Sequence, residues 1–150
     1  MKRILIDLDI LTNALWKGEK REEAKKFLAN IVKENVEILT PSTLIHLIFS
    51  WEDRKLAGEI LSFYSDNSDI LSQKTILGKF ESLGVDYKKI IEELTEVSGK
   101  EEDVFLVLVA SVFDLEIVTF NKKHLITKKD RMKQILRHYN LKEVEINEPI

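Results

Sequence analysis

The stretch Arg3-Ile4-Leu5-Ile6-Asp7-Leu8-Asp9 decides the fold. Three consecutive apolar side chains, Ile4 to Ile6, predict a strand that is buried on both faces, as the central strand of a parallel sheet is. Asp7 follows directly, at a place where a carboxylate is costly unless it is bonded to cations or to several hydrogen-bond donors. The alternative is that Asp7 or Asp9 caps the helix that follows.

Outward from this strand, strand-like and helix-like patterns alternate along the chain. This alternation predicts an α/β fold of three layers, with helices on both faces of a central parallel sheet. The further strands are expected over 36–39, over 116–120 and, as a closing edge strand, over 144–146. The helices are expected over Ile10–Lys17, 21–34, 53–64, 74–82, 86–99 and 128–139, and over the apolar run that follows Glu101-Glu102-Asp103.

Two segments between these elements are harder to place. Thr40-Pro41 is expected to open a helix that runs through Phe49, with Thr40 as N-cap and Pro41 in the first turn. Its polar stripe of Ser42, Thr43, His46 and Ser50, opposite Leu44, Leu47 and Ile48, faces either solvent or a site. Residues 66–75 fit a loop or a short helix.

Composition indicates one domain, residues 1–150, with a solvated surface. The 150 residues are 44% hydrophobic and 33% charged, and there is no cysteine, which excludes disulfide scaffolds and thiolate metal sites. The absence of cysteine fits a reducing, cytoplasmic location. Asp7 and Asp9 interrupt the apolar start, which argues against a secretory signal. The longest uncharged apolar run, Val104 to Phe113, is too short to span a membrane, which takes about 20 residues.

Charge is unevenly distributed, although the net charge is only −3. The segment from Lys122 to Lys142 is strongly basic and contains a single acid, Asp130, whereas the preceding stretch 92–103 is acidic. A basic segment beside an acidic site would hold a phosphate backbone. The alternative is a solvated helix face.

Polar residues follow the predicted strands at the carboxyl ends, where parallel sheets bind ligands. Asp7 and Asp9 follow the first strand, Asn121 follows the strand at 116–120, and Asp103 begins a buried helix. The alternatives are that Asp103 stabilises the helix N-terminus and that Asn121 is a turn residue. No glycine-rich phosphate loop, zinc-site histidine spacing or nucleophile elbow is found.

Taken in order, these segments resemble the PIN-domain family, especially the VapC-type toxin ribonucleases and their archaeal relatives. The stretch 5–11 looks like the family's first-strand motif, and 40–47 looks like the helix that normally carries a second acid, a Glu. Residues 102–106 resemble the helix of the third acid. Residues 117–125 resemble the fourth motif: a strand, Thr, any residue, then Asp or Asn. Each motif is short, but together they span nearly the whole chain.

The resemblance implies acids that meet at one pole of a parallel sheet, bind Mg²⁺ or Mn²⁺ and hydrolyse RNA phosphodiester bonds. It also implies a homodimer that is the toxin half of a toxin–antitoxin pair. The metal ligands would be Asp7 and Asp103, with Asp9 and Asn121, and the catalytic set would be Asp7, Asp103, Asn121 and His46. The residues expected to contact RNA are Thr119, Lys122, Lys123, Lys128, Lys129 and Arg131.

His46 is the main departure, because it stands where the family has Glu. An imidazole is a poor partner for Mg²⁺ but an acceptable one for Mn²⁺. The expectation is therefore weak metal binding, a preference for Mn²⁺, or no catalysis. Three hypotheses remain: a metal-dependent endoribonuclease, a catalytically silent PIN-like domain that binds RNA or a protein, and an unrelated α/β domain in which Asp7 and Asp103 are helix caps.

Overall fold

The computed structural model describes residues 2–16 and 18–149. These residues form a five-stranded sheet in the order β3-β2-β1-β4-β5, and every neighbouring pair is parallel. The predicted α/β class with a central parallel sheet between helices is confirmed. The strands are β1 (Arg3–Ile6), β2 (Glu37–Pro41), β3 (Asp69–Leu71), β4 (Glu116–Val118) and β5 (Ile146–Asn147).

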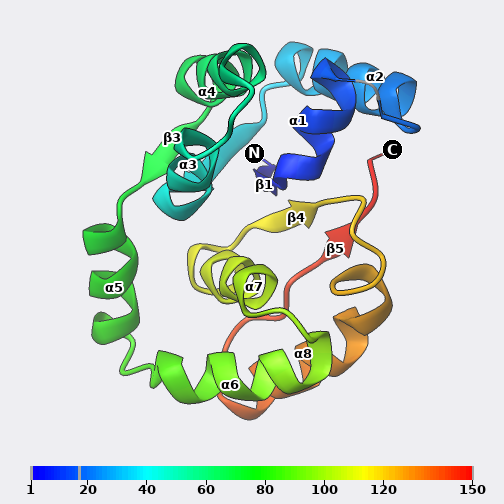
Figure 1. The fold of residues 1–150 in the computed structure, drawn as a ribbon. Helices are drawn as coiled ribbons and strands as arrows, with labels where there is room; N and C mark the ends of the chain where they lie inside the picture. Colours follow the sequence, from blue (N-terminus) through cyan, green and yellow to red (C-terminus); the bar gives the residue numbers. More distant parts are fainter. Residues whose placement is uncertain (1, 17, 150) are drawn as a thin grey trace.

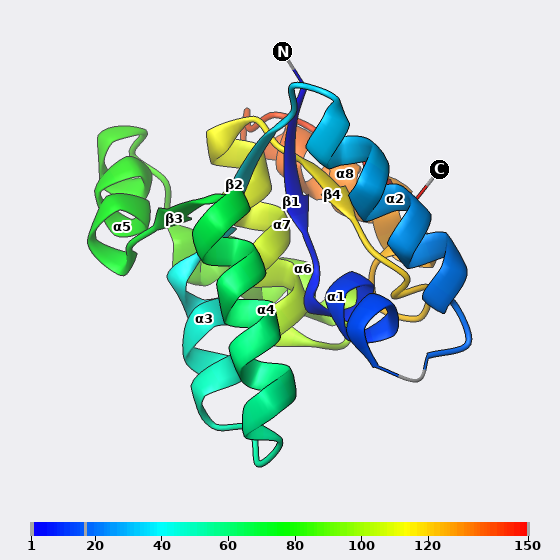
Figure 2. The ribbon, with the colours of Figure 1, turned by 90° about the horizontal axis from the view of Figure 1, so that it is seen from above.

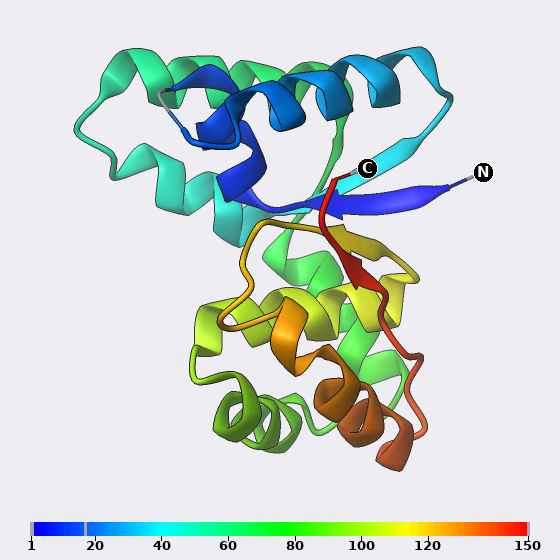
Figure 3. The same ribbon diagram turned by 90° about the vertical axis from the view of Figure 1, so that its right-hand side faces the viewer.

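Helices cover both faces of the sheet (Figure 1), and the three layers are clearest from the side (Figure 3). One layer holds α1 (Leu8–Leu15), α2 (Arg21–Lys33) and α4 (Arg54–Asn67). The other holds α5 (Gln73–Ser82), α6 (Tyr87–Ser98), α7 (Glu101–Phe113) and α8 (Lys129–His138). Helix α3 (Ser42–Phe49) follows β2 and lies beside α4 (Figure 2), and the short 3₁₀ helix η1 (Ile126–Lys128) precedes α8.

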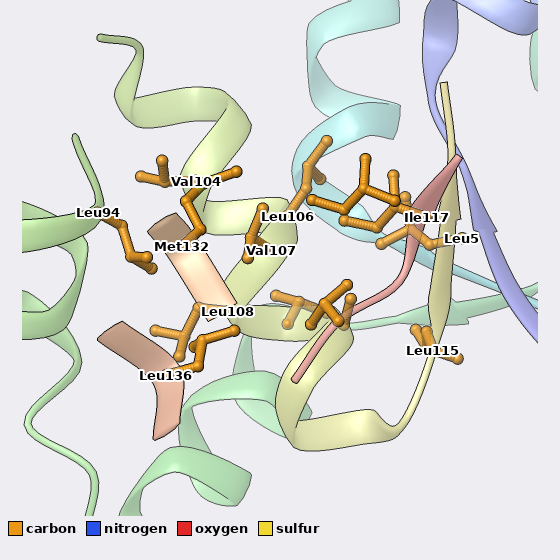
Figure 4. Packing of buried hydrophobic residues seen from close by; sticks show 14 of the residues in the cluster. Leu5, Leu94, Val104, Leu106, Val107, Leu108, Leu115, Ile117, Met132 and Leu136 are labelled. Carbon is orange, nitrogen blue, oxygen red and sulfur yellow. The ribbon is translucent and has the colours of Figure 1, made fainter. Parts of the chain in front are cut away.

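Strand β1 is buried on both faces, as its sequence predicts. Leu5 packs into the cluster formed with α5 to α8 (Figure 4), whereas Ile4 and Ile6 pack against α1 and α2. Successive side chains of a strand point to opposite faces, so a strand that is apolar at every position contributes to both cores. Ile117 and Val118 of β4 are divided between the two faces in the same way.

Helix α7 is the central element of its layer. Its apolar side chains pack between the sheet and the neighbouring helices, against Leu94 of α6 and against Met132 and Leu136 of α8 (Figure 4). A helix that is apolar on all sides is stable only when it is surrounded by other elements. The prediction of a buried helix after Glu101-Glu102-Asp103 is therefore confirmed. The fully or almost fully buried apolar residues of α7 are Val104, Leu106, Val107, Leu108, Val109 and Ala110.

Three sequence expectations about local structure are corrected. The helix expected after Thr40 is present as α3 and ends at Phe49, but it begins at Ser42 with Pro41 as its N-cap. Thr40 is not the N-cap, because Thr40 and Pro41 are the last residues of β2 and pair with Ile70 and Leu71 of β3. Residues 69–71 form that strand instead of a loop or helix, and three residues are too few for a strand pattern to stand out. Helix α1 begins at Leu8 instead of Ile10, and the predicted helix end at Lys17 lies outside the described residues.

The remaining elements follow the sequence pattern. Asp86 caps α6, and Gly99 ends it in the left-handed conformation, with φ 88°. The closing strand lies at the sheet edge but is displaced to Ile146–Asn147. None of the helices that the described residues form is long and apolar enough to cross a lipid bilayer.

Tyr64 of α4 connects the helical layer to the central strand. Its side chain is fully buried, and its hydroxyl donates a hydrogen bond of 3.0 Å to the carbonyl oxygen of Ile6. Burial raises the pKa of Tyr64, and the negative charges of Asp7 and Asp9 raise it further. The hydroxyl therefore stays protonated and remains a donor to the end of β1.

The Tyr64→Phe substitution is expected to lower the free energy of unfolding by about 1–2 kcal/mol, because it removes a hydrogen bond from a dry interior. Urea unfolding followed by circular dichroism measures the change. Tyr87→Phe is the matched control, since the Tyr87 ring stacks on Phe80 and keeps that contact without its hydroxyl. Equal stability of Tyr64→Phe and the unsubstituted chain would contradict the role of this bond.

Candidate functional site

Three chain segments meet at the pole of the sheet where the strands end. Asp7 follows β1 directly, and Thr119 to Asn121 follow β4. Helix α7 precedes β4 and runs back toward the start of that strand, so its first turn, with Asp103, lies at the pole where β4 ends. The connection between parallel strands thus brings Asp103 to the same pole as Asp7.

A pocket of about 1170 Å³ opens at this pole. All five residues that the sequence selects for metal binding or catalysis line it: Asp7, Asp9, His46, Asp103 and Asn121. The remainder of the lining mixes apolar and polar side chains and includes Leu8, Leu44, Leu47, Phe105, Lys100, Glu101 and Glu102. The expectation that distant segments converge on a shared pocket agrees with this arrangement.

Asp7 is both a helix cap and a member of this pocket. One carboxylate oxygen, Oδ1, accepts a 2.8 Å bond from the backbone N–H of Leu8 at the start of α1. The other, Oδ2, accepts a 2.8 Å bond from the hydroxyl of Thr119. The two interpretations of Asp7, cap and site residue, are therefore compatible in one side chain.

Asp9 lies beside Asp7 and bonds to the segment after β4. Its two carboxylate oxygens lie 3.2 and 3.1 Å from the backbone nitrogen of Phe120, which donates to them. The Thr119 hydroxyl lies 3.3 Å from Asp9 Oδ2 and 2.8 Å from Asp7 Oδ2, so Thr119 bridges the two acids.

Thr119 is one of the residues predicted to contact RNA. Its side chain is fully buried and bonds to the two acids, and its contact with RNA stays a prediction. The sequence pattern identifies the residue, but it does not show that the hydroxyl points back toward the end of β1.

Asp103 is held by Asn121. The Asn121 side-chain nitrogen donates a 2.9 Å bond to Asp103 Oδ2, and its Oδ1 accepts a 3.0 Å bond from the backbone N–H of His124. Since that N–H must meet an oxygen, the amide group of Asn121 is oriented with its nitrogen toward Asp103. Asp103 lies in the first turn of α7, whose N-cap residue makes no side-chain cap bond among the described residues, and Asp103 bonds to Asn121, a partner outside its own helix.

The acids repel one another in a poorly solvated place. Burial raises the pKa of Asp7, and the nearby charge of Asp103 raises it further, although the hydrogen bond from Thr119 opposes both. Burial and then the charge of Asp7 raise the pKa of Asp9 to about 7. A group of carboxylates with raised pKa values is a site that a bound cation would stabilise.

The donor set suits a hard cation, but the side chains do not form a complete metal site as they lie. Within residues 2–16 and 18–149, no group of three His, Asp or Glu side chains is arranged to hold a metal ion. Each carboxylate oxygen has two lone pairs, so the bonds that Asp7 and Asp103 accept leave lone pairs for a cation. Asp9 also lines the pocket, and its oxygens accept bonds from the Phe120 N–H.

Helix α3 contributes His46 and further side chains to the pocket lining. The His46 side chain is exposed on α3, and Thr43 and Ser50 of the same polar stripe also line the pocket. Leu44 and Leu47, expected on the opposite face, line it as well. Sequence reasoning missed Lys100, a pocket-lining cation whose charge lowers the pKa of Asp7.

The basic segment lies outside the pocket lining. Lys122 pairs with Glu148 at 3.3 Å, and Lys129 donates to the carbonyl oxygen of Ile146 at 3.4 Å. Further basic residues of the segment pair with acids near the C-terminus or at the end of α7, as Lys133 does with Glu145 and Lys142 with Asp114. The alternative of a solvated helix face therefore accounts for part of this charge. Contact of Lys122, Lys123, Lys128, Lys129 and Arg131 with RNA stays a prediction.

No protein-family model matches the chain, and a search of the curated proteins finds no match.

The raised pKa of Asp9 predicts a pH-dependent cost of folding. The folded protein binds the Asp9 proton more tightly than the unfolded chain does, so this group lowers stability as pH rises from about 4 to about 7. The free energy of unfolding of Asp9→Asn, relative to that of the unsubstituted chain, should therefore be higher at pH 8 than at pH 4, by roughly 1–3 kcal/mol. Urea unfolding at both pH values measures the gain.

Asp66→Asn is the matched control, because it makes the same chemical change at an exposed carboxylate of α4. Its stability difference at the same two pH values is the reference against which the Asp9→Asn difference is compared. Any loss of packing in Asp9→Asn affects both pH values equally. If the Asp9→Asn difference is the same at pH 4 and pH 8, the raised pKa of Asp9 is wrong.

Proposed function

We propose that the protein is a metal-dependent endoribonuclease of the PIN, VapC-like kind. The observation that supports the proposal most strongly is the convergence of Asp7, Asp9 and Asp103 in one pocket at the ends of the strands. The raised pKa values of Asp7 and Asp9 indicate that carboxylate charge is costly there. The resemblance of the sequence motifs assigns Asp7 and Asp103 as metal ligands, with Asp9 as a third carboxylate at a position where the family usually has Asn.

The three carboxylates are the residues that would hold Mg²⁺ or Mn²⁺, both of which prefer oxygen ligands. When bound, such an ion supplies positive charge that lowers the pKa of a water and offsets the charge of a leaving oxygen. In the proposed reaction, water adds to the phosphorus of an RNA phosphodiester and one P–O bond breaks. Thr119 and Asn121 orient the carboxylates in that arrangement.

RNA would approach the pocket from the side of the loop after β4, which begins the basic segment. Lys122 and Lys123 follow the pocket residue Asn121 directly, and both side chains are exposed. Lys100, which lines the pocket, adds a positive charge that lowers the pKa of Asp7. These cations would attract phosphates toward carboxylates that otherwise repel them.

The proposal extends to partners and location. A toxin of this kind would act in the cytoplasm, form a homodimer and be held by an antitoxin protein. Exposed apolar side chains on α3 and at the end of α1, Phe49 and Trp16, are 55% and 57% exposed and are suited to such contacts.

Purified protein is expected to cleave single-stranded RNA when Mn²⁺ is added, and Asp7→Asn should reduce the rate about 100-fold or more, since it removes a charged ligand. Gel analysis of end-labelled RNA measures cleavage. Asp66→Asn should retain the full rate. Intact RNA with both Mg²⁺ and Mn²⁺ would count against the proposal.

A second candidate is a catalytically silent domain that binds RNA or a protein, and His46 favours it. The imidazole lines the pocket where the resemblance places a Glu, so the pocket lacks one carboxylate for a cation. The internal bonds from Thr119, Phe120 and Asn121 already satisfy part of the acids' need for donors.

His46→Glu distinguishes the two candidates. In a silent domain, the added carboxylate should create or increase Mn²⁺-dependent cleavage and raise the Mn²⁺-induced shift in melting temperature. In an active enzyme that uses His46, cleavage should fall in Mn²⁺. His46→Gln is the control for loss of the imidazole without added charge. No change in either readout would mean that His46 does not face the site.

A further inference from the structure

A chain of hydrogen bonds connects Ser98 to Asp103 through the loop after β4. The Ser98 hydroxyl donates to the carbonyl oxygen of His124 at 2.7 Å, and the His124 ring nitrogen Nδ1 lies 2.7 Å from the Ser98 carbonyl oxygen. The backbone N–H of His124 donates to Asn121 Oδ1, and Asn121 donates to Asp103 Oδ2. The metal and catalytic assignments made above give no role to Ser98 or His124.

The two contacts between Ser98 and His124 are reciprocal and specific. A carbonyl oxygen can only accept, so the His124 Nδ1 must carry a proton and donate to it. Ser98 is almost completely buried at the end of α6. The loop 121–126 is thereby attached to the residues that precede α7.

Gly99 lies against the His124 ring. It follows Ser98 with φ 88°, and a Cβ at this position would lie 3.5 Å from His124 Nδ1. The ring therefore packs directly on the turn between α6 and α7. Helix α7 begins two residues later, and Asp103 lies in its first turn.

We propose that His124 is a positioning residue for the acidic pocket, which it serves by orienting the amide group of Asn121 and, through it, Asp103. The backbone N–H of His124 bonds to the Asn121 oxygen, so this oxygen points away from Asp103 and the Asn121 side-chain nitrogen points toward it. The Asn121 nitrogen engages Asp103 Oδ2, and no bond to Oδ1 is found among the described residues. Oδ1 therefore keeps its lone pairs for a cation in the pocket. This inference rests on the proposed function for the role of that cation.

Loss of the His124 ring would release the loop from Ser98 and let the Asn121 amide turn. Asp103 would then lose its orientation, although the substitution removes no carboxylate from the pocket. Residues that orient metal ligands in this way typically change metal affinity about 10–100-fold when they are substituted.

The test compares His124→Leu with His124→Asn. The side-chain nitrogen of Asn can take the place of Nδ1 and donate to the Ser98 carbonyl, whereas Leu cannot. Mn²⁺ binding is measured by the electron paramagnetic resonance signal of free Mn²⁺, without RNA. His124→Leu should bind Mn²⁺ about 10–100-fold more weakly, and His124→Asn should bind within a few-fold of the unsubstituted chain. His138→Leu, at an exposed position of α8, is the control.

A second readout needs no metal. The side-chain NH₂ protons of Asn121 should be shifted and slow to exchange in ¹⁵N NMR spectra of the unsubstituted chain and of His124→Asn, but not in His124→Leu. If His124→Leu fails to fold, Ser98→Ala removes only one of the two bonds and should give a smaller change in the same direction.

The outcomes separate the two proposals. Normal Mn²⁺ affinity and an unchanged Asn121 signal in folded His124→Leu would overturn the positioning role, whatever the RNA assay shows. Mn²⁺ binding that depends on His124, without RNA cleavage, would support the positioning role of His124 and contradict the proposed ribonuclease activity. If the unsubstituted chain binds no Mn²⁺, both the ribonuclease and the positioning role in metal binding are overturned.

Discussion

The carboxylate of Asp7 at the end of a strand buried on both faces is the constraint on which the site depends. β1 must be apolar at every buried position, because helices pack on both its faces. The strand therefore ends in a place with few water molecules, where a charge needs donors from the protein. The Leu8 N–H, from the helix that follows β1, and the Thr119 hydroxyl, from the segment that follows the neighbouring β4, supply them.

The fold is largely predictable from local sequence pattern. The residues that line the pocket are partly predictable in the same way, but the hydrogen bonds among them are not. The apolar run of β1 predicts a buried strand, and the apolar run that follows the acids of α7 predicts a buried helix. Both predictions need only the local sequence. β3 escapes prediction, because Asp69–Leu71 is short and its pairing with Thr40 and Pro41 is a long-range contact. The bonds of Thr119 and Asn121 depend on the same kind of contact, so no local pattern reveals which way their side chains point.

The internal donors limit repulsion among the acids only partly. Asp9 retains a raised pKa although the Phe120 N–H and the Thr119 hydroxyl both lower it, because burial and the charge of Asp7 have larger effects. The protein thus keeps a destabilising group of charges that selection for stability alone would remove. Such a local cost is typical of sites at which function requires it.

His46 is consistent with this balance of charge. A carboxylate in its place would add negative charge to a pocket that already contains Asp7, Asp9 and Asp103, whereas an imidazole carries no negative charge. Lys100 acts in the same direction, since its positive charge lowers the pKa of Asp7. The chain therefore has less repulsion among its pocket residues than a set of four acids would have, and correspondingly less attraction for a cation.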